Sequence, residues 1–142
     1  MPRPSRSRIH GRRAARRVAL QILYQADVTG RPPAEALKDM EAAGEHVPPY
    51  ARDVVVGVQE RLESLDAVVG QHARDWTVER MAVVDRNILR LACYELLYRP
   101  DVPDGVSISE AVEAAKELST EESGRFVNGI LGQIARDTAR EV

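Results

Sequence analysis

The chain has little of the residue types from which metal centres and redox sites are built. Its 142 residues include one cysteine, Cys93, and three histidines, His10, His46 and His72, which lie far apart in the sequence. A single cysteine excludes an intrachain disulfide and a zinc-binding cysteine cluster, and the histidines form no recognisable motif with it. No glycine-rich phosphate-binding loop is present. The sequence therefore predicts no metal, no cofactor and no enzymatic activity.

Long apolar runs are also missing. No segment approaches the roughly 20 residues that a membrane-spanning helix needs, and the amino terminus lacks the continuous apolar stretch of a secretory signal. With 44% apolar and 30% charged residues, the composition is typical of a soluble globular protein. We therefore expect a cytoplasmic protein without a membrane part.

Acidic side chains are absent from the first 17 residues, which contain seven arginines. The rest of the chain carries 13 basic and 22 acidic side chains, so a basic segment precedes an acidic body. This asymmetry predicts that one partner is a polyanion. Arginine outnumbers lysine eighteen to two in the whole chain. The evidence for a polyanion partner is therefore the clustering of positive charge and not the use of arginine in place of lysine.

The spacing of apolar residues predicts an all-α fold. Residues 1–10 carry prolines and serines among arginines and are predicted to form a flexible basic tail, followed by one helical domain over residues 11–142. From about residue 11, apolar residues recur at three- and four-residue steps, which predicts a first helix that ends near Thr29. A short helix is expected from Pro33 to Ala43, ending at Gly44 in a position that tolerates positive φ. The chain restarts at Pro48.

Three polar residues mark expected helix starts in the remainder of the chain. Ser64 is expected to cap one helix, Thr77 a single turn, and Ser107 another helix as part of a capping box with Glu110. The most apolar helix is expected over residues 85–98 and, because apolar residues occupy nearly its whole circumference, at the centre of the fold. A last helix is expected from about residue 123 to the end.

The basic segment continues into a helix that also carries an aromatic side chain. At about 100° per residue, Arg13, Arg17 and Tyr24 fall within a roughly 40° sector, away from the main apolar stripe. Arginine binds phosphate and stacks on bases, and an aromatic ring stacks on an unpaired base or docks a protein. This combination favours single-stranded RNA over duplex DNA, because no helix-turn-helix or zinc finger is evident. A solvated arm without nucleic acid remains the alternative.

Five short motifs in order resemble the NusB family of bacterial transcription antitermination factors along nearly the whole chain. The first motif joins residues 12–16 to residues 21–24. The next three are residues 85–90, 94–96 and 101–103. The fifth is the carboxyl-terminal signature between Ile108 and Leu131, which contains the sequence Phe126-Val127-Asn128-Gly129. The resemblance implies a compact fold of about seven helices in two helical subdomains. It also implies binding, together with NusE, the tenth protein of the small ribosomal subunit, to boxA RNA in nascent ribosomal RNA transcripts. Such binding promotes read-through by RNA polymerase in its antitermination complex.

The same resemblance implies functional residues by position. The implied RNA-binding residues are Arg12, Arg13, Arg16, Arg17, Glu122, Ser123, Arg125 and Phe126. Free backbone N–H groups at the start of the last helix, together with Arg125, are expected to meet phosphate. The implied NusE-facing residues are Tyr24 and Asp85, with Arg86 adjacent.

Two of these residues have a second interpretation. Phe126, the only phenylalanine, shares a helix with Ile130 and is explained equally well as a core residue. Asp85 is also expected to be the amino-terminal cap of its helix. For the whole chain, two alternatives are open. One is a NusB-like domain of the kind joined to RNA methyltransferases, although we expect no second domain to hold a methyl donor. The other is a homodimeric assembly protein that binds no RNA. The oligomeric state, the bases read and the need for NusE stay open.

Overall fold

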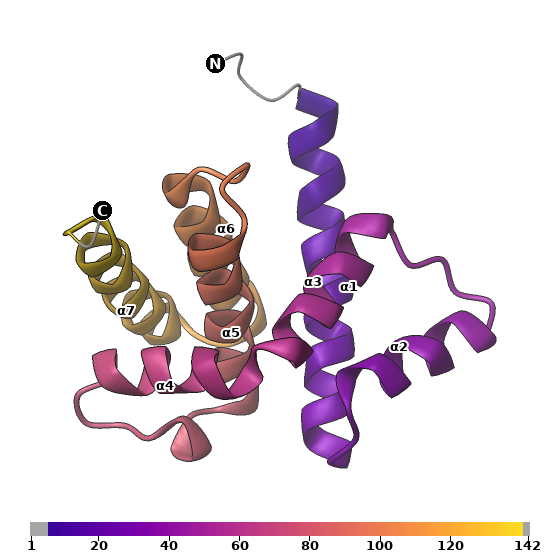
Figure 1. Cartoon of the computed structure of the whole chain (residues 1–142), viewed down its shortest axis with the longest axis horizontal. Coiled ribbons are helices and arrows are strands. Elements are labelled where there is room, and N and C mark those ends of the chain that lie inside the picture. The colour runs from indigo at the N-terminus through magenta and orange to yellow at the C-terminus, as the bar shows by residue number, and fades with distance from the viewer. Residues whose placement is uncertain (1–5, 141–142) are drawn as a thin grey trace. The chain divides into compact units, whose positions relative to one another are not determined.

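The computed structural model of the protein describes residues 6–140, with side chains described for residues 11–139. Every regular element in this part of the chain is helical, in agreement with the predicted all-α class (Figure 1). The elements are α1 (Arg6–Thr29), α2 (Pro33–Ala42), α3 (Pro49–Glu60), α4 (Leu62–His72), the 3₁₀ turn η1 (Val78–Arg80), α5 (Val83–Tyr98), α6 (Asp104–Leu118) and α7 (Glu121–Arg140). The chain divides into two compact units, the first ending at Gln59 and the second beginning at Glu60.

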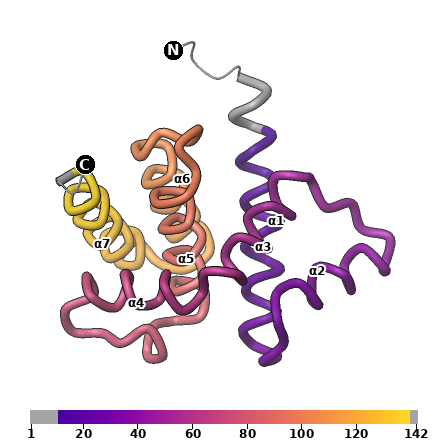
Figure 2. The backbone as a smooth tube through the Cα atoms, viewed as in Figure 1, coloured from indigo at the N-terminus to yellow at the C-terminus, as the bar shows by residue number. Residues whose placement is uncertain are grey.

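The first unit is built around α1, the longest helix of the described chain (Figure 2). The apolar stripe expected on this helix is buried: Ala19, Ile22, Leu23 and Ala26 have at most 2% of their surface exposed. Helix α2 packs against α1. The helix begins at Arg6, so residues 6–10 of the predicted tail are helical, while residues 1–5 lie outside the described residues.

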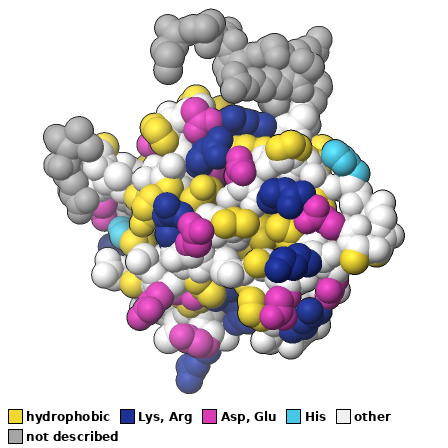
Figure 3. All heavy atoms as spheres, turned by 45° about the vertical axis from the view of Figure 1, so that its right-hand side comes forward, with side chains coloured by type: hydrophobic (Ala, Val, Ile, Leu, Met, Phe, Trp, Pro, Cys, Tyr) yellow, Lys and Arg dark blue, Asp and Glu magenta, His cyan; other side chains and the backbone are white. Residues whose placement is uncertain are grey.

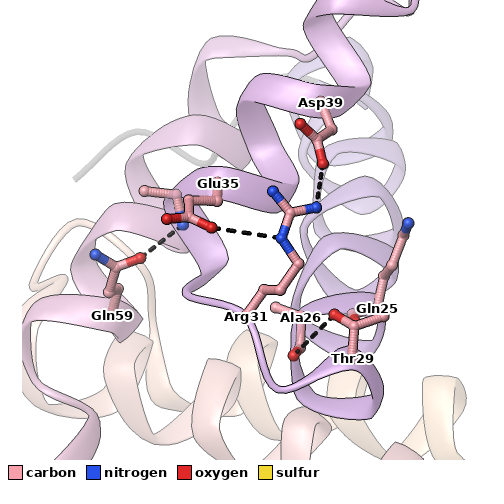
Figure 4. A network of polar contacts seen from close by, with 8 residues as sticks. Gln25, Ala26, Thr29, Arg31, Glu35, Asp39 and Gln59 are labelled. Atoms are coloured by element: carbon pink, nitrogen blue, oxygen red, sulfur yellow. Dashed lines mark hydrogen bonds and ion pairs between the residues drawn. The ribbon is translucent and has the colours of Figure 1, made fainter.

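The turn between α1 and α2 is closed by polar contacts (Figure 4). Gly30 has φ +71°, a left-handed conformation that ends α1. Arg31 forms ion pairs with Glu35 and Asp39 of α2, and the hydrogen bond to Asp39 raises the pKa of the guanidinium. Gln59 Oε1 accepts a 2.6 Å hydrogen bond from the Ala34 N–H, which is one of the donors that a helix start leaves unpaired. These contacts fix the first turn of α2.

The expected stop after α2 is confirmed. Gly44 has φ +84° and donates its N–H to the Glu41 carbonyl, so a glycine in the left-handed region follows the helix. Pro48 precedes α3, which begins at Pro49 and whose apolar residues Val54, Val55 and Val58 have no exposed surface.

The second unit has α5 at its centre, as the sequence predicts. Helix α5 packs against α4, α6 and α7, and nine of its 16 residues are buried. Arg90 of α5 donates from Nε and Nη2 to the two carboxylate oxygens of Asp66 on α4, at 2.7 and 2.9 Å. This bidentate pair joins the two helices.

Three expected helix starts in the second unit are wrong. Helix α4 begins at Leu62 after Arg61, so Ser64 is not its cap. Helix α6 begins at Asp104 after Pro103, which places Ser107 and Glu110 inside the helix as buried residues and not in a capping box. Helix α5 begins at Val83, so Asp85 lies in the first turn and is not the cap. In each case the helix begins before the polar residue; Asp85 and Ser107 are buried by the surrounding packing, whereas Ser64 is exposed.

The expected short turn after Thr77 is present as η1, with Thr77 at its amino-terminal cap position and no side-chain cap bond.

None of the helices in the described part of the chain combines the length and hydropathy of a membrane-spanning segment.

Candidate nucleic-acid interface

The four predicted RNA-binding arginines of α1 differ in exposure. Arg13 is exposed, Arg12 and Arg17 are half-buried, and Arg16 is buried with only 7% of its surface exposed. Arg16 lies close to the buried Ala19 and Leu20 on the side of the apolar stripe, whereas Arg12, on the same face, is one turn nearer the start of the helix. Arg12, Arg13 and Arg17 are thus the members of this set that present surface to solvent.

An aromatic side chain from α3 lies under two of these arginines. The guanidinium carbon of Arg12 is 4.5 Å from the centre of the Tyr50 ring, and that of Arg16 is 5.6 Å from it. Both distances are within the range of cation–π attraction. Sequence spacing did not identify Tyr50, because nothing in the pattern indicates that the start of α3 meets the start of α1.

The predicted partner residue Tyr24 is accessible on α1. It has 43% of its surface exposed, and Val28, one turn further along, has 58%. The two side chains form an exposed apolar pair at the i, i+4 spacing that places residues on one helix face. This pair is suited to contact another molecule, because apolar surface of this kind gains free energy when it is buried.

The start of α7 is organised by hydroxyl groups. Thr120 accepts a 3.0 Å hydrogen bond from the Ser123 N–H at its Oγ1, and it donates to Ser123 Oγ at 3.1 Å. The Ser123 hydroxyl in turn donates to Asp85 Oδ2 at 3.0 Å. The backbone N–H of Ser123 is therefore bonded within the protein, so it is not one of the free N–H groups expected at this helix start. Thr120 precedes the helix and fills the capping role.

Asp85 is buried beside this network, with 8% of its surface exposed. One carboxylate oxygen accepts the Ser123 hydrogen bond, and the other, Oδ1, is buried without a hydrogen-bond partner among the described residues. A carboxylate in the first turn of a helix is favoured by the positive end of the helix dipole. The structure thus brings a predicted RNA-binding residue and a predicted NusE-facing residue into direct contact.

Phe126 lines a pocket of about 440 Å³ next to these groups. It is half-buried, whereas Val127, Ile130 and Leu131 of the same helix form the core. The pocket is lined by Trp76, Arg80, Met81, Ala82, Asp85, Thr120, Glu122, Ser123 and Phe126. Trp76, the only tryptophan, is 53% exposed. No motif identifies it, although a lone tryptophan between Arg74 and Arg80 is a usable signal in the sequence.

The remaining predicted residues of the second unit differ in exposure. Glu122 and Arg125 are exposed in the first turns of α7. Arg86 is half-buried, and its Nη1 donates to the Glu79 carbonyl of η1 at 3.3 Å, so its side chain is directed to its own unit.

The predicted residues therefore form two groups. The α1 arginines and Tyr24 belong to the first unit, and the cluster of Asp85, Ser123 and Phe126 belongs to the second.

On the face drawn in Figure 3, Lys and Arg side chains are interspersed with Asp and Glu. Among the described residues, no group of three or more His, Cys, Asp or Glu side chains is placed to hold a metal ion.

Comparison with known proteins assigns these features to a family. The sequence matches the model of the NusB family over residues 13–136, which includes every predicted residue of both groups except Arg12. The chain belongs to the NusB family. It is 47% identical over 133 residues to the transcription antitermination protein NusB of Salinispora tropica, which covers 91% of this chain and 98% of that protein.

Solved NusB structures have the same fold. The structure of T. maritima NusB aligns with a TM-score of 0.79 at 34% identity and covers all of both chains. A crystal structure of the antitermination factors NusB and NusE in complex with double-stranded RNA contains a chain that aligns with a TM-score of 0.79 at 28% identity, covering 90% of this chain and 98% of that one. The similarity spans the full length of the NusB fold.

Proposed function

We propose that this protein is a transcription antitermination factor that binds boxA RNA together with NusE and acts in the antitermination complex of RNA polymerase. The observation that carries the proposal is the similarity over nearly the whole chain to proteins named transcription antitermination protein NusB. A structure of the same fold in complex with NusE and RNA supports it. The function is one of binding and not of catalysis, and its place is the cytoplasm, where transcripts are made.

RNA binding is assigned to the basic start of α1 and to the start of α7. Arg12, Arg13 and Arg17 supply accessible positive charge for phosphates. Phe126, half-buried at the rim of a pocket, supplies a ring on which an unpaired base stacks. Arg125 and Glu122 are exposed beside it, whereas Ser123 holds the local geometry through its hydrogen bonds. Arg16, which is buried, acts as a support for its neighbours.

NusE binding is assigned to Tyr24 and to the surface around Asp85 and Arg86. Tyr24 and Val28 present exposed apolar surface, which contributes to association when a partner covers it. The acidic charge of the chain beyond residue 17 favours a basic ribosomal protein, because complementary charge speeds encounter and disfavours wrong partners.

A titration of labelled boxA RNA with and without NusE tests the proposal. Three accessible arginines predict about three phosphate contacts; at a slope near 0.7 per contact, raising salt from about 50 to 200 mM weakens binding roughly 20-fold. A scrambled RNA of equal length controls for non-specific attraction. Single- and double-stranded forms of boxA distinguish the predicted single-stranded preference from duplex binding. No preference for boxA at low salt with NusE present contradicts the proposal, and a stable homodimer without RNA or NusE affinity favours the assembly protein.

A further inference from the structure

We propose that Tyr50 is a positioning residue for RNA binding, holding the guanidinium of Arg12 in the orientation in which it meets a phosphate. This inference rests on the proposed RNA-binding function. The observation behind it is the contact at the start of α3, where the Tyr50 ring lies 4.5 Å from the guanidinium carbon of Arg12 and 5.6 Å from that of Arg16. Neither the family motifs nor the helical spacing of α1 identifies this residue.

The helical repeat explains why one ring serves two arginines. Arg12 and Arg16 are four residues apart, so their side chains lie on the same face of α1, one turn from each other. The two differ in burial, because Arg16 has only 7% of its surface exposed whereas Arg12 is half-buried. The ring therefore contacts an inner arginine that is covered by protein and an outer arginine that is partly exposed.

The ring contact does not itself compete with phosphate for the outer arginine. Cation–π attraction acts between the charge of the guanidinium and the face of the ring, and it does not use the N–H donors. Arginine binds phosphate through those donors, which form a planar fork. Tyr50 thus restrains Arg12 without occupying the groups that recognise RNA.

Restraint of Arg12 before binding has a measurable benefit. An arginine side chain has several rotatable bonds, and immobilising such a side chain at an interface opposes association. A ring that already holds the guanidinium removes part of this cost. The expected contribution is about threefold to fivefold in RNA affinity, as for a cation–π contact at a partly exposed site.

Substitution of Tyr50 tests the role with the full-length protein and labelled boxA RNA in the presence of NusE. Tyr50→Phe keeps the ring and is expected to bind within about twofold of the unaltered protein. Tyr50→Leu removes the ring and is expected to bind about threefold to fivefold more weakly. In an Arg12→Ala background, Tyr50→Leu is expected to have no further effect, because the two residues act as one unit.

A matched control is available in the second unit. The guanidinium carbon of Arg61 lies 4.5 Å from the centre of the Tyr98 ring, the same separation as in the Arg12–Tyr50 pair. Tyr98→Leu therefore removes an equivalent contact within the second unit. It is expected to leave RNA affinity unchanged.

A shape-preserving series guards against an unfolded Tyr50→Leu variant. Phenylalanine with increasing fluorine content at position 50 keeps the ring but weakens its negative face, so RNA affinity is expected to fall stepwise. The Arg12 side-chain N–H resonance, shifted by the ring current in the protein without RNA, reports the contact directly. Affinity that is indifferent to Tyr50→Leu and to fluorination overturns the inference alone. Absence of boxA binding by the unaltered protein overturns the proposed function, and this role for Tyr50 with it.

Discussion

The hydroxyl of Ser123 donates a 3.0 Å hydrogen bond to the carboxylate of Asp85 and so joins the start of α7 to the first turn of α5. The family resemblance assigns the first residue to RNA and the second to NusE. Because the two side chains are in contact, a change at one alters the surroundings of the other. If the proposed roles hold, the start of α7 is where RNA binding and NusE binding meet within one unit.

Loss of this hydrogen bond is expected to destabilise the second unit. Ser123→Ala leaves the buried Asp85 carboxylate without the one partner it has among the described residues, at a cost of about 1–3 kcal/mol in the free energy of unfolding. Urea unfolding monitored by circular dichroism measures the change. Ser119→Ala is the control: Ser119 is exposed, although its Oγ is 2.9 Å from that of Ser123, and its loss is expected to cost less than about 0.5 kcal/mol. Equal costs for the two variants would refute this account.

Removal of an exposed α1 arginine is expected to weaken RNA binding without affecting stability. Arg13 is exposed, so Arg13→Ala removes charge and little packing. Affinity for boxA RNA is expected to fall roughly fivefold, about 1 kcal/mol, and the salt slope by about 0.7. Arg136→Ala, at an exposed arginine of α7, is the charge-matched control. An unchanged salt slope for Arg13→Ala would remove Arg13 from the RNA contacts.

A charge placed at Tyr24 is expected to abolish association with NusE. Tyr24→Asp removes exposed apolar surface and introduces a carboxylate that is costly to bury at an interface. A pull-down with purified NusE measures association, and circular dichroism verifies the fold. Tyr98→Asp, at a tyrosine of similar exposure in the second unit, is expected to retain NusE. Retention of NusE by Tyr24→Asp would place the interface elsewhere.

The single cysteine is expected to be inert in the folded protein. Burial raises the pKa of the Cys93 thiol from 9.0 to about 12, so the thiolate is scarce near neutral pH. Alkylation at about pH 8 is expected to be slow in the native protein and fast in guanidinium. Because the folded pKa lies above the unfolded one, this group favours the fold below pH 9, and its contribution is lost as pH rises from 9 to 12. Native alkylation as fast as that of the denatured chain would show that the thiol is accessible.

Much of the helical architecture is predictable from local pattern. The residues of α5 are apolar around nearly the whole helix, and such a helix has to be covered by its neighbours; α4, α6 and α7 do this. Gly44 follows α2 with a positive φ because glycine adopts this conformation without steric cost. The backbone preference of glycine is a local property, and the burial of α5 follows from its apolar surface. Both are therefore readable from the sequence.

The expected caps show where local pattern is insufficient. Ser107 and Glu110 have the spacing of a capping box, yet both are buried inside α6, which begins earlier, at Asp104. A polar residue compatible with a cap is also compatible with a helix interior when a neighbouring helix packs over it. Helix boundaries thus depend on packing that the local sequence does not specify.

The sequence by itself determined the all-helical class, the central position of α5, the concentration of positive charge at the amino terminus and, through its motifs, the NusB family. Only the tertiary structure decided which arginines are accessible, that Tyr50 lies under Arg12, and that Ser123 is bonded to Asp85. The physical reason is the range of the interactions. Helix formation and charge clustering arise between neighbours in the chain. The Arg12–Tyr50 contact and the Asp85–Ser123 hydrogen bond each join residues that are 38 positions apart, and only packing brings such residues together.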